Sequence, residues 1–184
     1  MGDSRLFLDL KLHDIPNTVV GGLRSVLTLR PWFLTLHAAG GGEMMRRAAE
    51  AALAAADGEA RTKLLGVTVL TSLGDADLAA TGQSRPVLDQ VLRLARLARE
   101  SGLDGVIASP HVAAVRAECG PDFLIVTPGV RPAWSAMDDQ KRVMSPAEAV
   151  AAGADYLVIG RPITRADDPR AAVHRIVEEI EAVH

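Results

Sequence analysis

Six apolar runs of strand length alternate with helical segments along the whole chain. The expected strands are 6–12, 32–37, 63–70, 105–108, 123–126 and 156–159. The expected helices are 19–29, 43–56, 87–101, 110–118, 145–152 and 169–183. Unbroken alternation of strand and helix favours the α/β class, in which crossover helices join the strands of a parallel sheet. No linker or low-complexity stretch divides the chain, so residues 1–184 are expected to form one domain.

The length of the chain limits which α/β architecture is possible. A doubly wound sheet and a (β/α)8 barrel both contain alternating units, and the periodicity alone does not distinguish them. A closed barrel needs eight units of about 30 residues each, or roughly 250 residues. With 184 residues, this chain is short of a closed barrel by about two units.

The expected strand over 6–12 has charged side chains on one of its two faces. Leucines at alternate positions form the other face, because side chains alternate along a strand. An edge strand with a solvated Asp-Lys face would explain the charges, but the near-continuous apolar character favours a buried parallel strand. Buried charges are costly unless they are paired and used. Asp9 and Lys11, with Asp14 three residues further on, are therefore candidates for chemistry.

Composition and motif content argue against several classes of protein. The formal net charge of −3 offers no basic surface for nucleic acid. No apolar run is long enough to span a bilayer, and the first residues lack a signal-peptide core, so no membrane partner is expected. The single cysteine, Cys119, cannot form an internal disulfide or a cysteine-built metal site, and it fits the reducing cytoplasm. The histidines lack the spacing of metal ligands, and no nucleotide-binding glycine fingerprint is present.

Polar side chains recur at the expected carboxyl ends of the strands, where parallel α/β folds bind ligands. They are Asp9, Lys11, Asp14, His37, Thr71, Ser72, Ser109, Arg131 and Arg161. The segments 127–132 and 160–164 each place a glycine beside an arginine after successive strands, an arrangement that suits a phosphate group. Either segment alone would also fit a surface turn. The two together predict a phosphorylated substrate, and Asp9 and Lys11 predict acid–base and electrostatic chemistry on it.

The loop over 127–143 is long for a compact domain, and loops of this length are often functional lids. Gln140 lies in its second half and is able to close over a ligand when such a lid shuts. A solvated loop residue would explain Gln140 equally well.

Taken together, the motifs of this sequence resemble a known family, the bacterial type of orotidine 5′-phosphate decarboxylase. The resemblance rests on the segments Asp9–Thr18, His37–Gly41, Val67–Ser72, Thr127–Arg131, Asp138–Arg142 and Val158–Ile163, in that order. It implies a (β/α)8 barrel, a cytoplasmic homodimer with shared active sites, and conversion of orotidine 5′-phosphate (OMP) to uridine 5′-phosphate (UMP) in pyrimidine synthesis. It also implies that neither a metal nor another cofactor takes part.

The resemblance further implies roles for individual residues. Lys11 resembles the lysine that delivers a proton to C6 of the pyrimidine, and Asp9 resembles the carboxylate beside the substrate's own carboxylate. Asp14 resembles the aspartate that each subunit contributes to its partner's site. The residues expected to bind substrate are Ile15, Thr18, Thr71, Arg131, Gln140, Gly160 and Arg161. The last four of these would hold the phosphate.

One departure from the family pattern concerns the amino-terminal side of the Asp9 motif. The family has two further β/α units there, which supply a ribose-binding aspartate and a second catalytic lysine. Only five residues precede Leu6 in this sequence, so these two side chains have no counterpart. We therefore expect six β/α units, strands 3 to 8 of the barrel, that form an open sheet and turn over OMP slowly or not at all.

Two other functions are compatible with the sequence. A barrel fragment of this kind could bind uridine nucleotides, or only dimerise, without catalysis. Metal-dependent sugar-phosphate decarboxylases and aldolases of the same suprafamily share an Asp-x-Lys-x-x-Asp element. Their motif does not usually continue as Ile-Pro-Asn-Thr, which favours the nucleotide enzyme.

Overall fold

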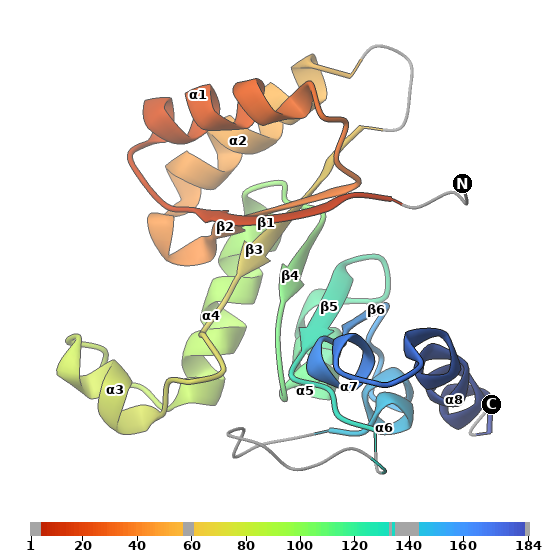
Figure 1. The fold of residues 1–184 in the computed structure, drawn as a ribbon. Helices are drawn as coiled ribbons and strands as arrows, with labels where there is room; N and C mark the ends of the chain where they lie inside the picture. Colours follow the sequence, from red (N-terminus) through yellow and green to blue (C-terminus); the bar gives the residue numbers. More distant parts are fainter. Residues whose placement is uncertain (1–4, 57–60, 133, 135–143, 183–184) are drawn as a thin grey trace.

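Six parallel strands form one curled sheet in the computed structural model, which describes residues 5–56, 61–132, 134 and 144–182 (Figure 1). They are β1 Phe7–Leu12, β2 Phe33–His37, β3 Lys63–Val67, β4 Gly105–Ile107, β5 Leu124–Pro128 and β6 Tyr156–Val158. Their order in the sheet is their order in the chain, β1-β2-β3-β4-β5-β6. A doubly wound sheet reverses its strand order at a switch point, whereas a barrel does not. The open question of architecture is thus answered in favour of a partial barrel, and the expected six β/α units are confirmed.

Helices follow the strands along the chain. They are α1 Pro16–Leu27, η1 Ala38–Gly40, α2 Gly42–Ala54, α3 Asp75–Ala80, α4 Val87–Glu100, α5 Val112–Cys119, α6 Pro146–Ala151, α7 Arg161–Thr164 and α8 Pro169–Glu181. Residues of α1, α2, α4 and α5 pack with the strands in one apolar cluster on the outer, convex face of the sheet. The sequence did not predict η1, α3 or α7, because helices of three to six residues are too short to show a hydrophobic period. None of the helices in the described part of the chain is long and apolar enough to cross a membrane.

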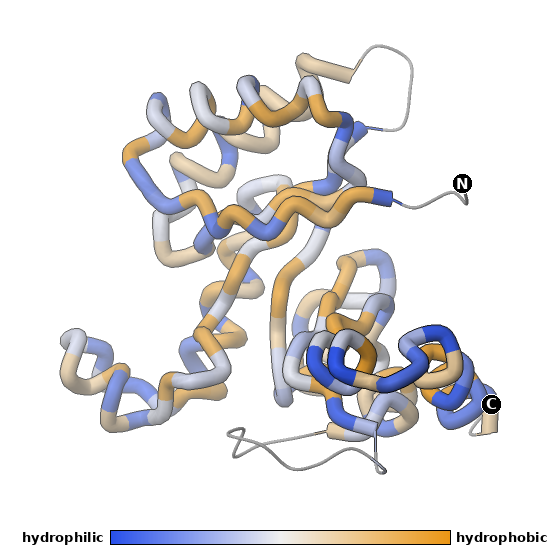
Figure 2. Tube along the Cα trace, viewed as in Figure 1, coloured by the Kyte–Doolittle hydropathy of each residue, from blue (hydrophilic) through white to orange (hydrophobic). Residues whose placement is uncertain are grey.

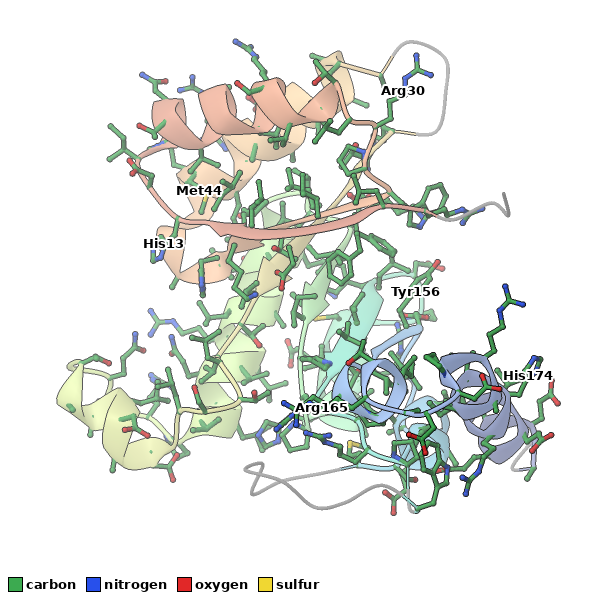
Figure 3. All side chains as sticks on the ribbon, in the orientation of Figure 1. His13, Arg30, Met44, Tyr156, Arg165 and His174 are labelled. Carbon is green, nitrogen blue, oxygen red and sulfur yellow. The ribbon has the colours of Figure 1, made fainter. Side chains whose placement is uncertain are left out.

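Apolar side chains are buried on both faces of the sheet, and the strands are accordingly apolar along most of their length (Figure 2). The larger cluster packs the convex face against the helices and includes Leu34, Leu36 and Ile125, all fully buried. A smaller cluster on the concave face contains Phe33 and two further buried residues. The ring of Phe33 lies 4.9 Å from that of Tyr156, labelled in Figure 3, so the curl brings β2 against β6.

Two aspartates join neighbouring strands at the amino ends of the sheet. Asp104, just before β4, accepts hydrogen bonds from the Leu64 backbone N–H at 2.8 Å and from both terminal nitrogens of Arg61. Asp155, just before β6, accepts in the same way from Ile125 N–H at 2.7 Å and from Arg116 at 2.6 Å. Each aspartate therefore fixes its own strand against the preceding one, and so aligns the carboxyl ends where ligands bind.

The expectation that the first strand is buried was wrong. β1 runs parallel to β2 as expected, but β2 is its only partner within the described ranges, and β1 forms one edge of the sheet. Leu10 is 45% exposed, and the side chains of Asp9 and Lys11 are 49% and 40% exposed. The apolar composition of a strand indicates that it packs on something, but it does not say on how many sides.

Candidate active site

A pocket of about 230 Å³ opens on the concave side of the sheet, toward the carboxyl ends of the strands. Its lining residues come from five of the six strands and the loops after them: Phe7, Asp9, Lys11, Val67, Val69, Leu70, Thr71, Ile107, Ser109, Pro128 and Val158. Four of the polar residues predicted at strand ends, namely Asp9, Lys11, Thr71 and Ser109, are thus brought together. The remaining lining residues are apolar, so the pocket pairs an apolar wall with one ion pair, an arrangement typical of a ligand site.

Asp9 and Lys11 form an ion pair on the pocket side of β1. The Lys11 Nζ donates to Asp9 Oδ2 at 2.5 Å. The Thr35 hydroxyl, on the adjacent strand β2, donates to Asp9 Oδ1 at 2.7 Å. Both carboxylate oxygens therefore have a donor, and the ammonium is held beside the pocket rather than free to extend into solvent.

A bulge in β1 creates this arrangement. Leu8 pairs with Leu34 and Leu12 pairs with Leu36, so four steps along β1 match only two along β2. Lys11 lies within the bulge with φ +50°, a left-handed conformation that is costly for a residue with a side chain. Its backbone N–H donates to the Thr35 hydroxyl at 2.9 Å. The side chain of Thr35 thus accepts the backbone hydrogen bond of a strained residue.

Electrostatics at the site favour an ionised Asp9. Burial alone would raise its pKa, but the hydrogen bonds from Lys11 and Thr35, with the positive charge of Lys11, outweigh burial and lower the pKa below its ordinary value. The pKa of nearby His37 is also lowered, first by burial and then by the charges of His13 and Lys11. Asp9 is therefore a carboxylate and His37 is held toward its neutral form near pH 7.

Thr35 was missed by the sequence reasoning, and two histidines that were treated separately prove to be neighbours. A lone threonine in a strand is common, so the only available signal was its position at the centre of the apolar run 32–37. The rings of His13 and His37 lie 5.2 Å apart; His13 is labelled in Figure 3 near the end of β1. Among the described residues, no group of three or more His, Cys, Asp or Glu is placed to hold a metal ion.

Of the predicted site residues that the structure describes, six lie outside the pocket lining, and three of these six follow β1. Asp14, Ile15 and Thr18 lie where the chain leaves β1 and enters α1, and all three are exposed. Asp14 Oδ1 accepts a hydrogen bond from the Ile15 N–H at 2.7 Å, and the side chain of Ile15 is 68% exposed. These residues therefore lie on the surface beside the site, and they do not line the pocket of the same chain.

The residues predicted to hold phosphate directly follow two strands that line the pocket. Pro128 ends β5 and is followed by Gly129 and Arg131; Val158 ends β6 and is followed by Gly160 and Arg161. The Arg131 N–H donates to Met144 O at 2.9 Å, which fixes its backbone beside β5. Gly160 is the residue before helix α7, and Arg161 is the first residue of that helix. Gln140 lies outside the described residues.

Comparison with known proteins identifies the family. The family model described as orotidine 5′-phosphate decarboxylase / HUMPS family matches residues 2–176. A protein of Trichlorobacter lovleyi named orotidine 5′-phosphate decarboxylase is 57% identical over 178 residues, covering 96% of this chain and 74% of that protein. One of the same name from Rhodospirillum rubrum is 59% identical over 178 residues, covering 95% of this chain and 72% of that protein.

A solved structure agrees with this result. The orotidine 5′-phosphate decarboxylase of Lactobacillus acidophilus superposes with a TM-score of 0.83 and 43% identity, over 96% of this chain and 75% of that one. The chain thus spans about three quarters of the length of these relatives. The resemblance seen in the motifs is confirmed, because sequence and fold agree over nearly the whole chain: it belongs to the orotidine 5′-phosphate decarboxylase / HUMPS family.

Proposed function

We propose that this protein decarboxylates OMP to UMP in pyrimidine synthesis, without a metal or other cofactor, and that Lys11 protonates C6 of the pyrimidine. The observation that supports this most directly is the Asp9–Lys11 pair, with its 2.5 Å contact, beside a pocket that also contains Thr71 and Ser109. The curated relatives at 57% and 59% identity bear the name of this activity.

The proposed chemistry is electrostatic and requires few groups. Loss of CO2 leaves a carbanion at C6, and a fixed ammonium beside that carbon stabilises the developing charge before it gives up a proton. Lys11 is suited to this role because Asp9 holds its Nζ in place at the pocket. Asp9, ionised at neutral pH, would lie beside the substrate's carboxylate.

Phosphate binding is assigned to the segments that follow β5 and β6. Arg131 and Arg161 offer charged donors, Gly160 offers backbone N–H, and Gln140 belongs to the same proposed set. In barrel enzymes, phosphates often bind at the loops after the last two strands. Thr71, which lines the pocket, would contact the pyrimidine. Binding energy from the phosphate, remote from C6, would orient the ring for reaction.

A second copy of the chain completes the proposed assembly. Asp14, Ile15 and Thr18 would enter the partner's site in a homodimer. All three residues are exposed and follow β1 closely after pocket-lining Lys11, so they are accessible to a second copy of the chain, which supports this role.

Binding and turnover together distinguish this proposal from its rivals. We expect calorimetric titration to show that the wild-type protein binds UMP more tightly than uridine. Arg161→Ala should weaken UMP binding about tenfold or more, since it removes a charged phosphate donor. Arg165→Ala, an exposed arginine four residues further on and labelled in Figure 3, is the matched control and should bind UMP as the wild type does.

The outcomes separate the functions clearly. UMP binding with slow but measurable OMP turnover supports the decarboxylase. UMP binding without any turnover supports a nucleotide-binding module. Turnover of a sugar phosphate only when a divalent metal is added, without UMP binding, would support the metal-dependent branch of the suprafamily and refute the proposal.

A further inference from the structure

Thr35 occupies an unusual place for a threonine in a buried strand. It is fully buried in β2, opposite the bulge of β1, between the register pairs Leu8–Leu34 and Leu12–Leu36. Its hydroxyl faces the same side as Asp9 and bonds to it, yet Thr35 is not among the residues that line the pocket. Any effect that Thr35 has on a bound ligand must therefore pass through its neighbours.

The hydroxyl satisfies a backbone group that the bulge would otherwise leave without a sheet partner. A bulge interrupts the ladder of strand hydrogen bonds, and the Lys11 N–H lies inside it. Thr35 Oγ1 accepts from that N–H at 2.9 Å, while Lys11 holds φ +50°. A left-handed residue with a side chain persists only when its surroundings hold it there. Thr35 supplies one such constraint.

The same hydroxyl also orients the carboxylate that holds the lysine. It donates to Asp9 Oδ1 at 2.7 Å, and Asp9 Oδ2 accepts from Lys11 Nζ at 2.5 Å. One hydroxyl thus contacts both the backbone of Lys11 and the carboxylate that binds its ammonium. Both of its hydrogen-bonding functions, acceptor and donor, are used.

We propose that Thr35 is a positioning residue, whose hydroxyl fixes the Lys11 backbone and the Asp9 carboxylate in one arrangement and so sets where the Lys11 ammonium lies. Its catalytic consequence rests on the proposed function, since a proton donor must lie within reach of C6. The geometric part of the proposal concerns Asp9 and Lys11 alone and holds whatever the substrate is.

Thr127 provides a matched comparison within the chain. It too is a fully buried threonine in a parallel strand, β5, directly before pocket-lining Pro128. In the part of the chain that the structure describes, however, the Thr127 hydroxyl has no hydrogen-bond partner. Replacing either threonine by valine removes a hydroxyl and keeps the shape, but only at Thr35 does the change break two hydrogen bonds.

The test compares Thr35→Val, Thr35→Ser and Thr127→Val in the full chain. The first readout is the pKa of the Asp9 carboxyl, followed by carbon NMR as a function of pH. Lys11, His37 and His13 are the other charged or titratable groups near it, and all are kept. We expect the Asp9 pKa to rise in T35V, because a hydrogen bond to the charged form is lost, and to remain near the wild-type value in T35S and T127V.

The second readout is steady-state turnover of OMP, with UMP binding as its control. T35V should lower kcat about 10- to 100-fold, as expected when a hydrogen bond to a charged group is removed, with little change in UMP affinity. T35S should restore kcat. If T35V does not fold, Thr35→Ala is compared with T35S in the same way.

Each result bears on a distinct claim. The proposal is overturned if T35V has both the Asp9 pKa and the kcat of the wild type. It is also overturned if T35V loses stability with no shift of the Asp9 pKa. Equal effects of T35V and T127V would also overturn it. If the wild-type protein shows no turnover, the proposed function fails while the NMR titration still decides the role of Thr35.

Discussion

Replacing Asp104 by alanine should destabilise the fold and, through it, the alignment of the pocket. The carboxylate accepts from Arg61 at 2.6 and 2.7 Å and from the Leu64 N–H at 2.8 Å. Its side chain is only 15% exposed, whereas that of Arg61 is 34% exposed. Because Asp104 joins β4 to β3 at their amino ends, the substitution loosens the strands whose other ends bear Val67 and Ser109 in the pocket.

The expected loss follows from the groups left without partners. A buried N–H such as that of Leu64, deprived of its acceptor, costs about 1–3 kcal/mol. The bidentate ion pair adds about 1 kcal/mol, since the one-third exposure of Arg61 lets water screen it. We therefore expect a loss of about 2–4 kcal/mol for D104A. Asp104→Asn keeps an acceptor for Leu64 and should lose only about 1 kcal/mol.

Urea unfolding followed by circular dichroism measures these losses. With a slope of about 2 kcal/mol per M, the midpoint should fall by about 1–2 M in D104A and by about 0.5 M in D104N. Asp122→Ala, an exposed aspartate in the turn before β5, is the control and should leave the midpoint unchanged. A D104A midpoint within about 0.2 M of the wild type would show that this contact does not hold the strands together.

Two further predictions concern packing and pH. Gly105→Ala should destabilise the protein by about 3 kcal/mol in the same assay, since the added Cβ would lie 2.3 Å from the backbone oxygen of Leu124. Gly21→Ala is the control: its Cβ would have nothing within 4 Å, and the change should stabilise helix α1 by about 0.5–1 kcal/mol. Equal effects of the two substitutions would refute the packing argument. The free energy of unfolding should fall as the pH drops below 6.5, because the pKa of His37 is lowered in the folded protein and the unfolded chain therefore takes up the proton first. It should fall again as the pH drops below 3.8, because the pKa of Asp9 is also lowered in the folded protein. Unfolding of His37→Gln across this pH range should show a shallower first decline, and an unchanged decline would contradict the assignment to His37.

The sequence was sufficient for the features that depend on local pattern. The alternation of apolar runs predicted all six strands, and the position of charges on the first strand singled out Asp9 and Lys11, which line the pocket. Thr71 was predicted from its place at the end of an expected strand, and it also lines the pocket. The strands were predictable because strand periodicity follows from general rules, and the pocket position of these side chains was predictable because parallel sheets bind ligands at the carboxyl ends of their strands. The roles of these residues in binding and catalysis stay predictions.

Features that depend on tertiary contacts were not accessible in this way. The bulge in β1 arises from its pairing with β2, so the role of Thr35 could not be read from either strand alone. The edge position of β1 depends on which strands lie beside it, not on its own composition. The contact between Phe33 and Tyr156 requires the curl of the whole sheet.

The most direct test of the account is the decarboxylation of OMP, followed by ultraviolet absorbance, in the wild-type chain and in Lys11→Ala. We expect slow but measurable turnover in the wild type and none in K11A, while both proteins bind UMP. Because Lys11 is the proposed proton donor, its loss should remove the reaction and not only weaken binding. Equal turnover in the two proteins would contradict the role of Lys11, and no turnover in either would contradict the proposed activity of this chain.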